Sequence, residues 1–190
     1  MKIVGITYYD GSEVLVLKSD SSMTVNRKPL FVPEVIKGLQ GLPCWVLRVS
    51  RLGKCIAPRF ASRYYDAVAA GMDFFGADNL LAAQAAGKPW TEAVAFEGSL
   101  AIGNWVAPTA SAMTGEWRLC RGDEQAEKRT WDGDLSDVFD QAIARASELL
   151  TIRQGDLVYV AHKQEPWLMQ TNDIIRCQDG EKELLYCKIK

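Results

Sequence analysis

The first residue to test for chemistry is the single histidine, His162. One histidine excludes a metal site built from several imidazoles, and any Ser-His-Asp triad would have to use His162. The sequence contains no G-x-S-x-G, no P-loop and no G-x-G-x-x-G. We therefore interpret His162 as a surface residue at the end of a strand.

The cysteines form no recognisable reactive or metal-binding pattern. There are five of them, scattered and without a C-x-x-C pair, at positions 44, 55, 120, 177 and 187. An odd, dispersed set is typical of reduced thiols in the cytoplasm. A disulfide between Cys177 and Cys187 across a hairpin remains the alternative for that pair.

Composition indicates one globular domain and argues against nucleic-acid and membrane partners. The chain has 190 residues, 48% of them hydrophobic and 24% charged, with a formal net charge of -2. This balance lacks the basic field that would follow a nucleic-acid backbone, so we expect no nucleic-acid partner. No apolar stretch approaches the roughly 20 residues of a membrane span, and no leader precedes the first strand. We expect a cytoplasmic protein with no membrane partner.

The elements that must position any site are mostly strands. Short β-rich runs flank the turn dipeptide Asp10-Gly11, and a second polar turn at residues 122–124 joins two further runs. Gln178-Asp179-Gly180 marks a third hairpin. The predicted strands or extended pieces are 3–7, 14–18, 30–33, 45–51, 100–106, 116–121, 128–131, 157–161, 173–177 and 183–189.

Three helices are predicted among these strands. Apolar residues at three-and-four spacing after Pro58 indicate a helix that Gly71 would end. Asp78 is a candidate N-cap for a short helix through Ala86. The apolar stripe of residues 138–150 is the clearest helix, capped by Asp134 or Ser136. We interpret these stripes as core, so the sequence predicts a mostly β chain with peripheral helices, α+β in class.

An ordered set of short motifs resembles the fumarylacetoacetate hydrolase family. The likeness is to its short, single-domain members, related to 2-hydroxyhepta-2,4-diene-1,7-dioate isomerase and acylpyruvate hydrolase. The resemblance implies a mixed β-roll or distorted barrel over residues 1–190, a single domain whose N-terminal segment 1–33 is shortened. The motifs are VLKSDSS (16–22), KPLFVP (28–33), RVSRLGK (48–54), ASRYY (61–65), GMDF (71–74), GKPW (87–90), AFEGS (95–99) and LLTIRQGDL (149–157).

The resemblance also implies a divalent cation, Mg²⁺, Mn²⁺ or Ca²⁺, held by a Glu-x-Glu pair on one strand and an aspartate after the first helix. Such a hard ion takes about six oxygen ligands. Aligned on the family pattern, the two glutamates fall on Leu42 and Cys44, and the aspartate falls on Asp73. Pro43 lies between the first two and favours the start or edge of a strand. Asp73 is thus the one metal-ligand candidate retained.

Other functional positions implied by the resemblance are also altered. The substrate lysine falls on Val94, and the acidic residue that follows it falls on Glu97. Gly11 stands where the family has a histidine. Against the family pattern, the lid that carries the acid/base residues is deleted, with Glu13 as a remnant. The late turn that closes the pocket falls on residues 161–166.

Two hypotheses follow. In the first, the protein is a non-catalytic homologue with a binding, assembly or regulatory role and no cofactor. In the second, it is an active hydrolase, decarboxylase or isomerase that acts on an acylpyruvate or 2-oxo acid through a rebuilt, metal-dependent site. A third possibility makes Cys44 a nucleophile if its pKa is lowered. The family also implies a homodimer. The polar residues that would converge in a rebuilt site are Asp73, Asp78, Glu97, Lys163 and Glu165.

Overall fold

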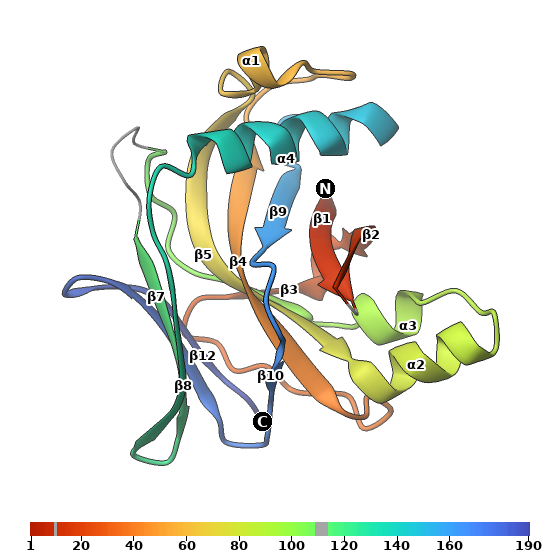
Figure 1. Cartoon of the computed structure of the whole chain (residues 1–190), viewed down its shortest axis with the longest axis vertical. Helices are drawn as coiled ribbons and strands as arrows, with labels where there is room; N and C mark the ends of the chain where they lie inside the picture. The colour runs from red at the N-terminus through yellow and green to blue at the C-terminus, as the bar shows by residue number, and fades with distance from the viewer. Residues whose placement is uncertain (10, 109–113) are drawn as a thin grey trace.

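A curled eight-stranded mixed sheet dominates the computed structural model, which describes residues 1–9, 11–108 and 114–190. Its strand order is β2-β1-β9-β4-β5-β6-β3, with β10 paired to β4 (Figure 1). Strand β1 pairs antiparallel with β2 and parallel with β9. The strands of this sheet are β1 Lys2–Tyr9, β2 Ser12–Ser19, β3 Met23–Val25, β4 Leu39–Val49, β5 Tyr65–Gly76, β6 Leu100–Ile102, β9 Leu157–Ala161 and β10 Trp167–Leu168.

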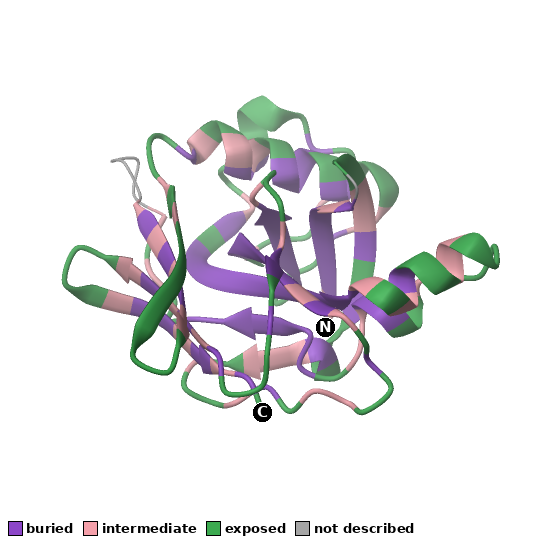
Figure 2. Cartoon of the chain, turned by 60° about the horizontal axis from the view of Figure 1, so that its bottom comes forward, coloured by how far each residue is buried: buried purple, intermediate pink, exposed green. Residues whose placement is uncertain are grey.

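A second, four-stranded antiparallel sheet lies beside the first, in the order β12-β11-β7-β8 (Figure 1). Its last strand, β8, is largely exposed, whereas β4 and β5 of the main sheet are buried almost throughout (Figure 2). Both predicted hairpins of this region are confirmed, over Gly122 and Gly180. The strands are β7 Gly115–Arg121, β8 Glu124–Trp131, β11 Ile174–Asp179 and β12 Lys182–Lys188.

Within the described ranges, four α-helices and one short 3₁₀ helix surround the sheets. The predicted stripe of α4 is confirmed at its centre: Phe139, Ile143 and Ala146 are buried against the sheet, where the Phe139 ring meets Trp45 edge-on at 6.3 Å. At the end of the helix Leu149 is 61% exposed, so this residue is not core. Asp134 accepts a hydrogen bond from the backbone N–H of Ser136 at the start of this helix. The bounds are η1 Asp20–Ser22, α1 Pro58–Ala61, α2 Ala77–Ala85, α3 Thr91–Val94 and α4 Ser136–Leu149.

Each face of the main sheet carries its own apolar cluster, because successive side chains of a strand point to opposite faces. On β4, Trp45 and Leu47 face α4, and we call this the α4 face. Leu42 and Cys44 face the other way, toward α3, and we call this the α3 face. Both faces are covered, so β4 and β5 are nearly continuous apolar runs rather than alternating ones.

The predicted helix from Pro58 to Gly71 is wrong in its second half. Only Pro58–Ala61 is helical, and Tyr65–Gly76 is strand β5, paired with β4 along its whole length. A strand buried on both faces fills helical spacing as well as strand spacing with apolar residues, so periodicity could not separate the two. Asp73 therefore lies inside a central strand and not at the end of a helix.

The structure also corrects two local predictions. Pro43 lies inside β4 rather than at an edge, between the stretches that pair with β10 and with β9. Its missing N–H falls in that gap, while its carbonyl accepts a hydrogen bond from the His162 N–H at 2.8 Å. Asp78 lies within the first turn of α2, and Gly76 is the N-cap.

The structure confirms the predicted N-terminal hairpin and the prediction of free thiols. Strands β1 and β2 pair from Lys2 with Ser19 to Tyr9 with Ser12, although Asp10 of the predicted turn lies outside the described residues. All five cysteines are free, including Cys177 and Cys187. No helix among the described residues is both long and apolar enough to cross a membrane.

Candidate functional site

The Asp73 carboxylate lies on the α3 face of the sheet, in the middle of β5 and directly opposite Leu42 of β4. Two further strands bring polar groups to it. Thr7 of β1 donates its hydroxyl hydrogen bond to Asp73 Oδ2 at 2.8 Å. Lys18 of β2 places its Nζ 2.7 Å from Asp73 Oδ1. The N-terminal hairpin of β1 and β2 and the distant strand β5 thus meet at one carboxylate.

Lys18 is a fully buried lysine, since its side chain and that of Asp73 both have 0% exposure. Its ammonium also donates to the Ser99 carbonyl at 2.9 Å and lies 3.0 Å from the Ser99 hydroxyl. Burial lowers the pKa of Lys18, and the Asp73 charge opposes that shift. Lys18 supplies the counter-charge that a buried carboxylate requires, and Thr7 supplies a hydrogen bond to Oδ2. Asp73 Oδ1 contacts the ammonium but accepts no hydrogen bond from the described residues.

The two positions where the resemblance places metal-binding glutamates are apolar and closed. Leu42 and Cys44 are both 0% exposed and pack in the cluster of the α3 face. Val94, at the position of the family's lysine, is buried in the same cluster. Burial, reinforced by the Asp73 charge, raises the pKa of the Cys44 thiol well above its usual range. A buried, protonated thiol is a poor nucleophile, which argues against the third possibility.

These residues do not fit a divalent cation. Mg²⁺, Mn²⁺ and Ca²⁺ need several anionic or carbonyl oxygens that converge on one point. Here one carboxylate is present, and an ammonium already contacts it. Within the described ranges, no group of three or more His, Cys, Asp or Glu side chains is arranged to hold a metal ion.

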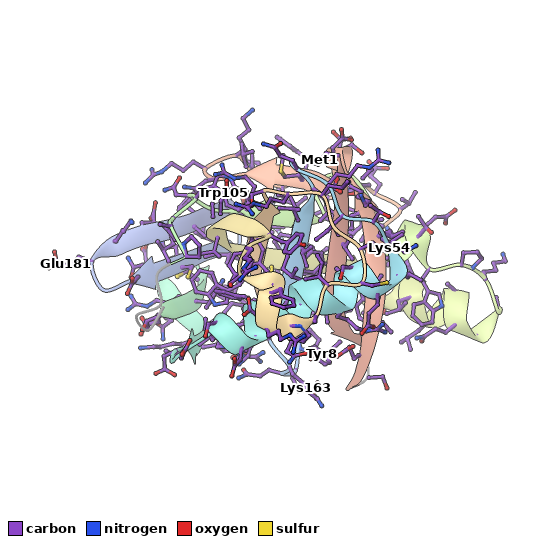
Figure 3. All side chains as sticks on the ribbon, turned by 90° about the horizontal axis from the view of Figure 1, so that it is seen from above. Met1, Tyr8, Lys54, Trp105, Lys163 and Glu181 are labelled. Atoms are coloured by element: carbon purple, nitrogen blue, oxygen red, sulfur yellow. The ribbon has the colours of Figure 1, made fainter. Side chains whose placement is uncertain are left out.

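An open cavity of about 460 Å³ lies near this cluster but does not include Asp73 in its lining. The hairpin end of β1, the start of β4, helix α2 and the loop after β9 form its walls. Lys163 Nζ lies 5.6 Å from the centre of the Tyr8 ring, and the two side chains project from the same edge of the molecule (Figure 3). The lining includes Tyr8, Tyr9, Phe75, Leu80, Lys163 and Glu165.

Tyr9 is common to the cavity and to the surroundings of Asp73. Its ring lines the cavity and meets Phe75 edge-on at a centroid distance of 4.9 Å, yet only 5% of the residue is exposed. Burial raises the pKa of the Tyr9 phenol, and the nearby Asp73 charge adds to the shift. Tyr9 and Phe75 are therefore the cavity wall nearest the Lys18–Asp73 pair.

The cavity loop is held from the second sheet. His162 stacks on Trp131 of β8 at a centroid distance of 4.4 Å, and the Arg129 side chain donates a hydrogen bond to the Glu165 carbonyl. His162 is half-buried rather than a simple surface residue. Burial lowers the pKa of His162, with a further contribution from Arg129. Strand β8 thereby positions the segment that carries Lys163 and Glu165.

The structure separates the five residues expected in a rebuilt site. Lys163 and Glu165 line the cavity, Asp73 lies behind its wall, and Asp78 and Glu97 are exposed elsewhere. The sequence reasoning gave no role to Thr7 or Lys18. A signal was available: Lys18 follows Val16 at strand spacing, so a lysine occupied an inward position of a β-rich run.

The curled mixed sheet with outer helices is the fold of fumarylacetoacetate-hydrolase-like proteins. A putative family protein from Yersinia pestis CO92 matches at a TM-score of 0.80 and 19% identity, covering 100% of this chain and 92% of that one. Fumarylpyruvate hydrolase from Pseudomonas aeruginosa, in complex with Mn²⁺ and pyruvate, gives 0.79 and 15%, covering 100% and 89%. The 2-hydroxyhepta-2,4-diene-1,7-dioate isomerase from Mycobacterium marinum gives 0.77 and 16%, covering 99% and 73%.

Comparison at the level of sequence leads to the same family. The family model described as Fumarylacetoacetate (FAA) hydrolase C-terminal matches residues 8–180. The chain therefore belongs to the fumarylacetoacetate hydrolase family, as its motifs indicated, and it has the mostly β fold expected from them. No curated protein matches this sequence.

Proposed function

We propose that this protein is a non-catalytic member of its family, with a binding role in place of metal-dependent hydrolase or isomerase chemistry. One observation carries the proposal. The single carboxylate left at a metal position, Asp73, is fully buried, contacts Lys18 and Thr7, and lies outside the cavity. A catalytic metal must contact both its ligands and the substrate, and Asp73 does not line the cavity through which a substrate would reach it.

The test is a titration of metal-stripped protein with Mn²⁺ by calorimetry, with acylpyruvate hydrolysis assayed in parallel. We expect no binding heat and no turnover at millimolar Mn²⁺. Asp73→Asn is the matched control, because it keeps the size of the side chain and an oxygen for Thr7. Micromolar binding that Asp73→Asn abolishes would refute the proposal.

The cavity supports the binding role and indicates a class of ligand. Phe75 and Leu80 give it apolar walls, and the exposed Lys163 ammonium supplies one positive charge at its rim. Apolar walls with polar groups that fix the orientation of a ligand are the usual form of a small-molecule site, and Gln40 and Gln164 add polar groups to this lining. We propose a small carboxylic acid, such as a 2-oxo acid, bound without a metal and with its carboxylate toward Lys163.

An active enzyme with a rebuilt site is the alternative, and one observation favours it. Lys163 and Glu165 line the same cavity, where an acid and a base would both reach a bound 2-oxo acid. Turnover of an acylpyruvate or decarboxylation of a 2-oxo acid, lost in both Lys163→Met and Glu165→Gln, would support the alternative over the proposal.

We retain a homodimer as part of the proposal. Phe31 and Val35 are 69% and 72% exposed, and both lie in the segment that joins β3 to β4. Large apolar side chains so exposed in one segment favour a protein contact. Light scattering of the wild type and of Phe31→Ser/Val35→Ser tests this. We expect a dimer for the first and a monomer for the second.

A further inference from the structure

The charges of the buried cluster around Asp73 balance without any metal. Asp73 contributes one negative charge and Lys18 one positive charge, and both side chains are 0% exposed. A divalent cation added to this pair would leave two uncompensated positive charges in a buried site, which the protein interior strongly disfavours.

The two glutamate positions of the family account for that balance. The charges of two glutamates and one divalent cation sum to zero. A chain that loses all three therefore keeps a neutral site, because Lys18 still balances the remaining carboxylate, Asp73. Leu42 lies directly opposite Asp73, and Cys44 lies opposite Gly71 on the same face. Glutamates at these two positions would therefore project toward the carboxylate that Lys18 now contacts.

We propose that Lys18 is the resident cation of this site, and that the protein excludes divalent metal because the Lys18–Asp73 pair is already neutral. Charge rather than space is then the determinant. The inference rests on the proposed function, since it explains how a member of this family has a closed site without metal. The contacts of the Lys18 ammonium with the Ser99 carbonyl and hydroxyl hold it in this position.

The experiment restores the two carboxylates and leaves Lys18 in place. Mn²⁺ binding to Leu42→Glu/Cys44→Glu is measured by calorimetry and by loss of the free Mn²⁺ paramagnetic resonance signal, neither of which requires activity. We expect Mn²⁺ to bind at least about 100-fold more tightly than to the wild type, because even outer partners of a metal change affinity 10- to 100-fold. The melting temperature should rise with Mn²⁺ in this variant alone.

Leu42→Gln/Cys44→Gln is the matched control, since glutamine has the size of glutamate without its charge. If space decided, neither variant would bind Mn²⁺, because neither adds room to the site, and that result would overturn the inference. Should the double glutamate variant fail to fold, Leu42→Glu/Lys18→Met leaves two carboxylates and no lysine, a net charge of -2 that one Mn²⁺ balances. The inference then requires a Mn²⁺-dependent rise in its melting temperature, and the absence of any rise would overturn it.

The proposed function and the role of Lys18 are refuted by measurements on different proteins. Mn²⁺ binding to the wild type would refute the metal-free proposed function. A folded Leu42→Glu/Cys44→Glu variant that binds no Mn²⁺, beside a wild type that also binds none, would refute only the role assigned to Lys18.

Discussion

The charged residues on the two sides of Tyr9 differ in burial and in their partners. On the inner side, Lys18 and Asp73 are fully buried and satisfy each other. On the outer side, Lys163 and Glu165 stand exposed on a loop around a cavity of about 460 Å³. The inner pair is held by strands of the main sheet, and the outer pair by a loop that β8 anchors.

This difference shows where binding has remained possible. A buried ion pair whose partners come from the protein leaves nothing for a ligand to contact. Exposed charges beside an apolar wall are free to meet a ligand and contribute little to folding. The proposed function therefore assigns a structural role to the central strands and places recognition at the cavity. Matched changes on the two sides of Tyr9 test this division.

Lys18→Met gives the largest expected effect. It removes the ammonium and leaves the Asp73 carboxylate buried without a counter-charge, so we expect the free energy of unfolding to fall by about 3–5 kcal/mol. Lys163→Met makes the same substitution on the exposed side, where we expect a change within about 0.5 kcal/mol. Urea unfolding followed by tryptophan fluorescence measures both.

The pairing itself is tested by Lys18→Met/Asp73→Asn. Both partners are then neutral, and the new amide oxygen would still accept the Thr7 hydrogen bond, so the double variant should be more stable than Lys18→Met alone. Equal losses in Lys18→Met and Lys163→Met would erase the proposed difference between the two sides.

Gly5→Ala should give the next largest effect, again on the inner side. A Cβ at Gly5 would lie 2.1 Å from Tyr159 Cζ, in a position that no side chain can share with the ring. Overpacking of this kind costs about 1–3 kcal/mol. Urea unfolding should also show that Gly5→Ala and Tyr159→Leu are not additive, because removing the ring relieves the contact. Simple additivity would contradict the packing described for Gly5.

Most of the fold could be predicted from local patterns and motif order, and the largest failure has a clear physical cause. The α4 stripe and the turns at Gly122 and Gly180 are local signals, and the structure confirms them. Strand β5 was predicted in part as helix because both of its faces are buried. Burial on two faces is a property of the tertiary structure, and a single stretch of sequence does not carry it.

The site was less predictable than the fold. The substituted positions Leu42 and Cys44 were found by resemblance, but the partner of Asp73 was not. Lys18 and Asp73 are far apart in the sequence. Strands β1, β9 and β4 lie between β2 and β5 in the sheet, so the contact forms because the sheet is curled. Lys163 and Glu165 were expected to converge with Asp73, yet Tyr9 and Phe75 form the wall between them.

On the outer side, substitutions should alter ligand binding rather than stability. We expect Lys163→Met to weaken binding of pyruvate or a larger 2-oxo acid by about 10-fold or more, because a hydrogen bond to a charged group contributes about 1.5–3 kcal/mol. Glu165→Gln should tighten binding, since it removes a like charge beside the ligand carboxylate. Metal-free titration followed by nuclear magnetic resonance measures both, and changes in the same direction would argue against a carboxylate ligand.

The smallest expected effect is the pH dependence that His162 gives to the cavity loop. Burial and Arg129 lower the pKa of His162 in the folded protein. The unfolded chain, with an ordinary histidine pKa of about 6.5, therefore takes up the proton first as pH falls. Stability from this residue is complete above that pH and is lost as the pH drops below it toward the lowered folded value. The neutral ring is also the form that stacks on Trp131 beside Arg129 without charge repulsion.

His162→Gln removes this titration, so the difference in unfolding free energy between wild type and variant should shrink as pH falls from about one unit above 6.5 to about one unit below it. Urea unfolding at the two pH values gives that difference directly. Because Lys18 and Asp73 are unchanged in both proteins, their contribution cancels in the comparison. A difference that stays constant with pH would mean that His162 does not couple to folding, and the loop that carries Lys163 would then have to be positioned by the Arg129 hydrogen bond to Glu165 alone.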